Sequence, residues 1–180
     1  MNTNMKSKAI NTSYEVFAIT RSFDAPLELV FSAFTDPEHL MQWWGPKGFK
    51  MLYCKLDLRP GGMFHYFAQS PEGDPLWGRF VYREISAFRR IIFINSFSDE
   101  YANLTPTPFS GWPREMLNKV RFLEKDHKTI VMLTSEAINT NEEERKNFVA
   151  GFGLMKNGYN GTFDQLEDHL NRIVAISKIA

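Results

Sequence analysis

The chain has 180 residues, of which 43% are hydrophobic and 14% aromatic, which is enough material for one domain with a proper core. Twenty-one basic residues balance twenty-one acidic residues without a basic cluster, which argues against nucleic acid and anionic membrane surfaces as partners. The single cysteine, Cys54, excludes an intramolecular disulfide, and the N-terminus lacks an apolar segment of signal-peptide length, so we expect a cytoplasmic location and no membrane insertion.

The first segment of the chain is polar. Residues 1–13 show neither helical nor strand periodicity, so we expect a disordered N-terminal tail, followed by a single domain over residues 14–176. That domain opens with a strand that ends at Asp24, because Phe17 and Ile19 lie at alternate positions.

Two short helices are expected directly after this strand. Pro26 suits the first turn of one helix, which continues to Thr35 with apolar residues at helical spacing. Pro37 opens the second helix, and Gly45 followed by Pro46 ends it.

The middle of the chain predicts a meander of six strands joined by turns, at residues 49–58, 63–68, 77–85, 90–97, 116–124 and 129–135. A long loop at residues 98–113 interrupts it. Loops of this length are uncommon in compact domains and are typical of lids or binding segments. Because Phe109 and Trp112 are expected to be exposed on this loop, we also predict a homodimer that forms through residues 98–113.

The last part of the chain has the clearest helical period. One helix from Thr140 to Leu170 is expected, with a capping box formed by Thr140 and Glu143. Glycines within this pattern imply close packing or open space beside the helix. Consecutive strands with short connections pair antiparallel, so the order of elements predicts an α+β fold in which the long helix covers one face of a sheet.

Several spaced segments match a known pattern: Thr35–Pro46, Asp57–Gly62, Gly78 with Phe80 before Glu84 and Ile85, and Met155–Tyr159 with Phe163–Leu166. Over about residues 14–170 the chain resembles the homologues of the heat-shock chaperone ATPase activator. These homologues belong to the START, polyketide cyclase and birch pollen allergen superfamily (SRPBCC).

This resemblance implies a helix-grip fold, in which a curved antiparallel β-sheet wraps round a long C-terminal helix and two short helices close one end of an apolar cavity. Members of the superfamily bind lipids, sterols or polyketides, and a minority are cyclases or hydrolases. The chain departs from the commoner pattern at Tyr159, where tryptophan is frequent, and at residues 63–65, and both differences would alter the lining of a pocket.

Aromatic side chains at alternate strand positions and along the helix indicate where a ligand would bind, since such side chains commonly line apolar sites. The candidate cavity-lining residues are Trp43, Trp44, Phe64, His65, Tyr66, Phe80, Tyr82, Phe152, Met155, Tyr159 and Phe163. Each of them also fits an ordinary core. For the tryptophan pair, a helix anchor and a cavity wall both remain open, because adjacent helix positions point about 100° apart.

The chain offers no recognisable catalytic constellation. Its four histidines show no metal-ligand spacing, so we expect no metal and no cofactor. His65 is the histidine that could act as an acid or base in the cavity, and Asp57 fits a turn brace with Arg59 better than a catalytic acid.

The leading hypothesis is therefore a binding protein for a small hydrophobic molecule, either lipid-like or aromatic. Two alternatives stay open. The first is a regulator that contacts a chaperone in a stress response, as the resemblance implies. The second is a cyclase or hydrolase that uses His65, Tyr66 or Asp57.

Overall fold

The computed structural model describes residues 15–177, so the tail expected at residues 1–13 lies outside the described residues. In chain order the elements are β1 (Phe17–Phe23), α1 (Leu27–Thr35), α2 (Pro37–Trp43), β2 (Lys50–Leu56), β3 (Met63–Gln69), β4 (Pro75–Ser86), β5 (Arg90–Phe97), β6 (Glu115–Lys125), β7 (Lys128–Ile138), α3 (Glu142–Ala150) and α4 (Phe152–Ser177).

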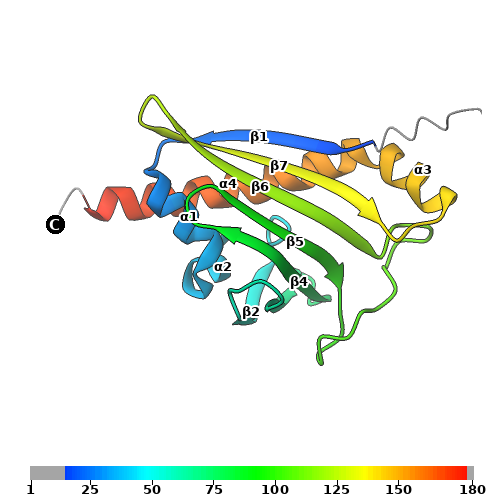
Figure 1. Cartoon of the computed structure of the whole chain (residues 1–180). Coiled ribbons are helices and arrows are strands. Elements are labelled where there is room, and N and C mark those ends of the chain that lie inside the picture. The colour runs from blue at the N-terminus through cyan, green and yellow to red at the C-terminus, as the bar shows by residue number, and fades with distance from the viewer. Residues whose placement is uncertain (1–14, 178–180) are drawn as a thin grey trace, which may run out of the picture.

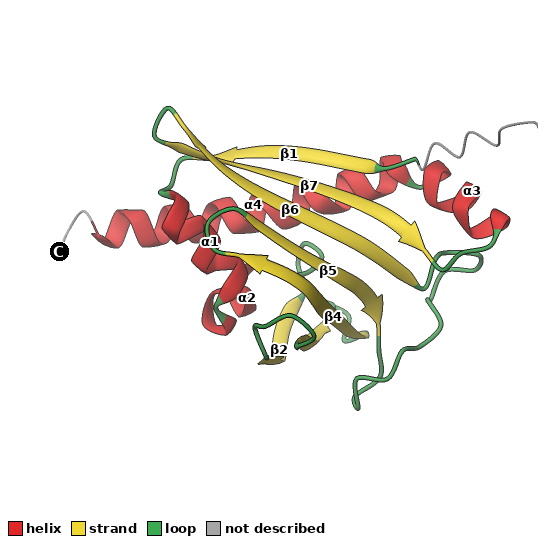
Figure 2. Ribbon diagram, in the orientation of Figure 1, coloured by secondary structure: helices red, strands yellow, loops and turns green. Residues whose placement is uncertain are grey.

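All seven strands form one antiparallel sheet in the order β1-β7-β6-β5-β4-β3-β2. The sheet is curved, and α4 runs along one of its faces while α1 and α2 lie towards one end (Figure 1; Figure 2). Irregularities in β2, between Met51 and Tyr53, and in β4, between Tyr82 and Glu84, interrupt the pairing register, and such bulges bend a strand. The predicted helix-grip α+β fold is confirmed.

The core fills the space between α4 and the inner face of the sheet. On β3 the alternation places Phe64 on this face, and α4 contributes Phe163 and Leu166, which are fully buried. The ring of Phe163 meets that of Phe23 on β1 edge to face, with 5.9 Å between the ring centroids. Burial of these large apolar side chains is the main stabilising contribution, at about 1.5–3 kcal/mol for each.

The helix expected from Thr140 to Leu170 is two helices, α3 and α4, which meet at Gly151. The capping box is also shifted by one residue, because the Asn141 side chain accepts from the Glu144 backbone N–H and the Glu144 carboxylate accepts in return. At the break, a Cβ on Gly151 would overlap the ring of Trp112. The glycine is therefore where the long loop packs against the helical segment.

The last residues of the loop at 98–113 are attached to α3. The Asn147 side-chain amide donates to the Gly111 carbonyl at 2.8 Å, and the ring of Trp112 lies 5.8 Å from that of Phe148. Trp112, which the sequence suggested as an exposed contact, is thus partly buried against its own chain. Phe109 is 61% exposed, so the homodimer through this loop stays a prediction.

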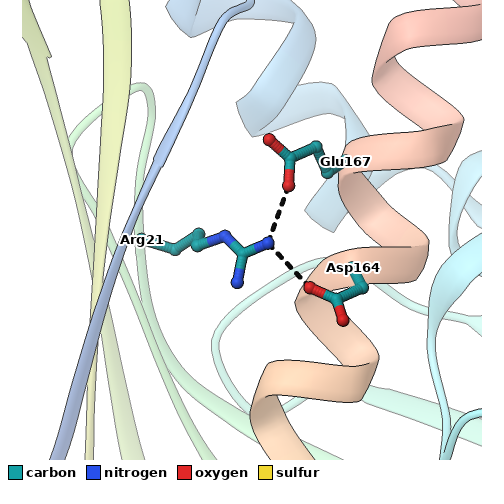
Figure 3. Close-up of polar contacts among 3 residues, drawn as sticks. All are labelled: Arg21, Asp164 and Glu167. Atoms are coloured by element: carbon teal, nitrogen blue, oxygen red, sulfur yellow. Dashed lines mark hydrogen bonds and ion pairs between the residues drawn. The ribbon is translucent and has the colours of Figure 1, made fainter.

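Arg21 joins the edge strand β1 to the middle of α4 (Figure 3). Its Nη2 atom donates to Asp164 Oδ1 and to Glu167 Oε2, each at 2.7 Å. These two carboxylates, Glu167 most strongly, raise the pKa of the Arg21 guanidinium. The acids are three residues apart on one helix face, so one arginine fixes the helix relative to the strand.

A second contact ties α4 to α2. His39 Nδ1 lies 2.8 Å from His169 Nε2; His169 is buried and His39 is half-buried. Burial lowers the pKa of His169, and the neighbouring His39 and Arg172 lower it further. One hydrogen bond between two imidazoles requires a lone pair on one of them, so the pair is disfavoured when both are protonated.

We expect Arg21→Gln to lower the free energy of unfolding by roughly 1 kcal/mol, because the pair of carboxylates loses its partner at a partly exposed site. Urea denaturation at low and high salt checks this, since salt screens the contact and should shrink the difference. Lys146→Gln is the control, because the exposed pair of Lys146 and Glu142 lies within one helix, and its loss should matter less. Equal effects of the two substitutions would contradict the assigned role.

We expect the protein to lose stability as the pH falls below the ordinary pKa of histidine. In the unfolded chain His169 binds a proton near its ordinary pKa, whereas in the folded protein its pKa is lower. The stability that neutral His169 contributes is therefore complete above the ordinary pKa and is lost as the pH falls below it. Unfolding midpoints in urea between about pH 7.5 and pH 5.5 measure the slope. His169→Gln should flatten it, and His127→Gln, at an exposed turn, should not.

Candidate ligand cavity

A cavity of about 380 Å³ lies between the N-terminal half of α4, strands β3 to β6 and the loop at residues 98–113. This volume is within the range of about 300–1,000 Å³ that is usual for small-molecule sites. The walls are mainly apolar. They come from the α2–β2 connection (Trp44 to Phe49), the sheet (Tyr66, Phe97, Met116), the loop (Phe109, Trp112) and the helix (Met155, Tyr159).

The structure brings part of the predicted site together. Of the candidates, Trp44, Tyr66, Met155 and Tyr159 line this cavity. Those buried in the surrounding core instead are Trp43, Phe64, Phe80, Tyr82 and Phe163. Phe152 packs beside the cavity on Phe17 of β1, with 5.7 Å between the ring centroids.

Of the two interpretations of the tryptophan pair, the helix anchor applies to Trp43 and the cavity wall to Trp44. Trp43 is 1% exposed and its Nε1–H donates to the Ala33 carbonyl at 2.8 Å, so it anchors α2 to α1. Trp44, just after the helix, lines the cavity and meets the ring of Phe80 edge to face at 4.9 Å.

His65 lies outside the cavity lining. Because strand residues alternate between faces, it is on the opposite side of β3 from Phe64 and Tyr66. There its Nε2–H donates to the Asp99 carbonyl at 3.0 Å, and its ring stacks on Trp77 at 5.0 Å. The structure therefore separates this imidazole from any molecule held in the cavity.

Asp57 is also away from the cavity. Its carboxylate pairs with Arg59, 3.0 Å from Nη2, in the exposed turn between β2 and β3. This is the turn brace that the sequence suggested.

Two phenols line the cavity, of which Tyr66 is buried and Tyr159 is partly buried. Burial raises the pKa of Tyr66 and of Tyr159, and the closeness of Tyr66 raises that of Tyr159 further. Both hydroxyls therefore keep their protons. The Tyr159 hydroxyl donates to Asn118 Oδ1 at 3.4 Å, which is a long hydrogen bond.

Tyr66 owes its position to a glycine on the next strand. Gly78 is its register partner on β4, and a Cβ at that position would overlap the Tyr66 ring and hydroxyl. The Tyr66 ring thus packs directly against the backbone of β4 at Gly78, where there is no side chain. The Trp44 indole N–H is fully buried and makes no hydrogen bond of ordinary geometry within residues 15–177, but it lies near enough to the Tyr66 hydroxyl to lower the pKa of that phenol against the larger, raising effect of burial.

The sequence missed part of the lining. Asn95 and Phe97 of β5 and Met116 of β6 face the cavity, together with Pro108 and the exposed Arg114 beside the loop. The inward alternation of β5, with Ile91 and Phe93 buried, was the available signal. This alternation identifies the residues on the inner face of the sheet, but not which of them border a cavity instead of packing in the core.

Within residues 15–177, no group of three or more histidine, cysteine, aspartate or glutamate side chains could hold a metal ion. None of the helices in this part of the chain is long and apolar enough to cross a membrane.

Solved structures of bacterial proteins share this fold. A protein from Mycobacterium smegmatis is 25% identical, with a TM-score of 0.71 over 87% of this chain and 91% of that one. A protein from Nitrosomonas europaea is 24% identical, with a TM-score of 0.70 over 91% and 98%. A protein from Arthrobacter aurescens is 23% identical, with a TM-score of 0.73 over 88% and 87%. Among curated proteins, none matches the chain.

The family model described as "Activator of Hsp90 ATPase homolog 1-like protein" matches residues 24–171, which include nearly all of the sheet, α1, α2 and the cavity-lining part of α4. The chain therefore belongs to the family of Activator of Hsp90 ATPase homolog 1-like proteins.

Proposed function

We propose that this protein is a cytoplasmic binding protein that holds a small hydrophobic molecule between the sheet and α4. The observation that supports this most is the cavity of about 380 Å³, which corresponds to the volume of about a dozen waters at about 30 Å³ each. Its walls combine aromatic rings, a methionine pair and few polar groups, as is typical of sites for apolar ligands.

The family and the fold support either ligand binding or a regulatory role. The regulatory candidate, contact with a chaperone, rests on the printed name of the family alone. A cyclase or hydrolase would need a base beside the bound molecule. Of the three candidates for that role, His65 and Asp57 do not line the cavity. Tyr66 does, but burial raises its pKa and keeps its proton in place, which favours binding over turnover.

Gly158 and Gly153 provide a matched test on one helix. A Cβ on either meets no atom within 4 Å, but only Gly158 lines the cavity. We expect Gly158→Leu to weaken binding of the neutral dye N-phenyl-1-naphthylamine by about tenfold or more, because the new side chain occupies ligand volume, equivalent to about 1.4 kcal/mol. Gly153→Leu should bind as the unchanged protein does. Dye fluorescence titration measures both.

Two results would count against the proposal. One is an absence of dye binding by the unchanged protein. The other is equal dye affinity in the two leucine variants, because the dye would then bind elsewhere on the surface. Circular dichroism shows whether both variants keep their helical content, and native mass spectrometry of gently purified protein shows whether a molecule is already bound.

A further inference from the structure

The cavity has a closed side and a side that solvent reaches. Its closed side includes buried lining residues such as Tyr66 of β3 and Thr162 of α4. The exposed lining residues form the rim of the other side, and they are Pro46, Pro108, Phe109, Arg114 and Gly158. A molecule in the cavity would therefore have one end against the buried residues and the other end at this rim.

Arg114, which directly precedes β6, gives the rim its charge. It is the one charged side chain that lines the cavity in the described part of the chain, and no carboxylate of residues 15–177 forms an ion pair with it. The carboxylate of the next residue, Glu115, instead accepts from the Asn139 amide at 3.0 Å. Arg114 therefore has N–H donors available for a bound molecule.

We propose that the molecule held in this cavity is an amphipathic carboxylate, whose apolar body lies against the buried lining and whose carboxylate pairs with the Arg114 guanidinium at the rim. This inference rests on the proposed function. A guanidinium presents its N–H donors in a fork that matches the two oxygens of a carboxylate. At the exposed rim the carboxylate keeps part of its hydration, which avoids the cost of placing a charge in an apolar interior.

The charge of the rim argues against the two other kinds of head group. None of the lining residues in the described part of the chain is acidic, so a cationic head would meet Arg114 without a counter-charge. A neutral head could accept hydrogen bonds from Arg114, but it would lack the attraction between opposite charges. A carboxylate therefore gains the most from this rim.

Two pairs of ligands test this inference, and each pair differs only in the replacement of a carboxylate by a neutral carboxamide. They are decanoate with decanamide, and 2-naphthoate with 2-naphthamide. Displacement of N-phenyl-1-naphthylamine gives the affinity of each ligand, and the ratio of acid to amide affinity is the anion preference. We expect Arg114→Gln to lower this preference about threefold to fivefold in at least one pair, as an exposed ion pair can supply. Unchanged amide affinity would show that the variant keeps its cavity.

Two further variants separate a contact with Arg114 from a general effect of charge. Arg121→Gln removes the same charge from an exposed position on β6 that does not line the cavity, so the anion preference should persist. Arg114→Lys keeps the charge and should retain more of the preference than Arg114→Gln does. Raising the salt from about 0.05 M to about 0.5 M should lower the preference of the unchanged protein but not that of Arg114→Gln, because salt screens exposed charges.

An anion preference that is the same in Arg114→Gln and in the unchanged protein for both pairs would overturn the inference and leave the proposed function standing. An equal loss in Arg121→Gln would also overturn it, as would tighter binding of decyltrimethylammonium than of decanoate. If no member of either pair displaces the dye, the inference fails, and the proposed function fails with it only if N-phenyl-1-naphthylamine itself does not bind.

Discussion

The packing of α4 along the inner face of the sheet is the constraint on which the rest of the molecule depends. In its middle, Phe163, Leu166 and Leu170 are essentially fully buried, so this stretch is part of the core. In its N-terminal half, Met155 and Tyr159 line a cavity instead. The middle of the helix thus fixes its position, while its N-terminal part packs on Phe17 of β1 and leaves a cavity towards strands β3 to β6, and this is how a hollow can persist beside a close-packed core.

The boundary between the two halves is fastened to α2. Thr162 donates to the Gly45 carbonyl, and the Gln165 side-chain amide donates to the same oxygen at 3.1 Å. Gly45 follows directly after Trp44, so these bonds also fix the backbone that carries the cavity-lining indole. The connection after α2 therefore forms one wall of the cavity and is held in place by α4.

The fold could be predicted from the sequence because its information is local. The period of two in segments such as Arg90–Phe97, separated by turn residues, predicts strands, and consecutive short connections predict antiparallel neighbours. The break at Gly151 could not be predicted in this way. Phe148 and Phe152 keep helical spacing across it, and its cause, the ring of Trp112, lies far away in the sequence.

The candidate site was only partly predictable for a related reason. Phe64 and Tyr66 have the same alternation on β3, yet Phe64 is buried in the core and Tyr66 lines the cavity. Whether such a residue packs in the core or borders a cavity depends on how far the helix lies from the sheet at that position. Sequence periodicity carries no information about this spacing. For His65, by contrast, strand alternation is sufficient, because it alone assigns His65 to the opposite face of the sheet from Phe64 and Tyr66.

Three of the segments by which the family resemblance is recognised lie at the end of the cavity that holds Trp44 and Tyr66. Trp44 and Gly45 belong to one of them, Gly78 to another, and Gly158 with Tyr159 to a third. Their physical roles are to admit a phenol against bare backbone, to hold an indole edge and to leave room beside a helix. These roles account for open space at this end of the cavity. They do not specify its remaining walls, which come from β5, β6 and the long loop, and the shape of the molecule that fits depends on those walls.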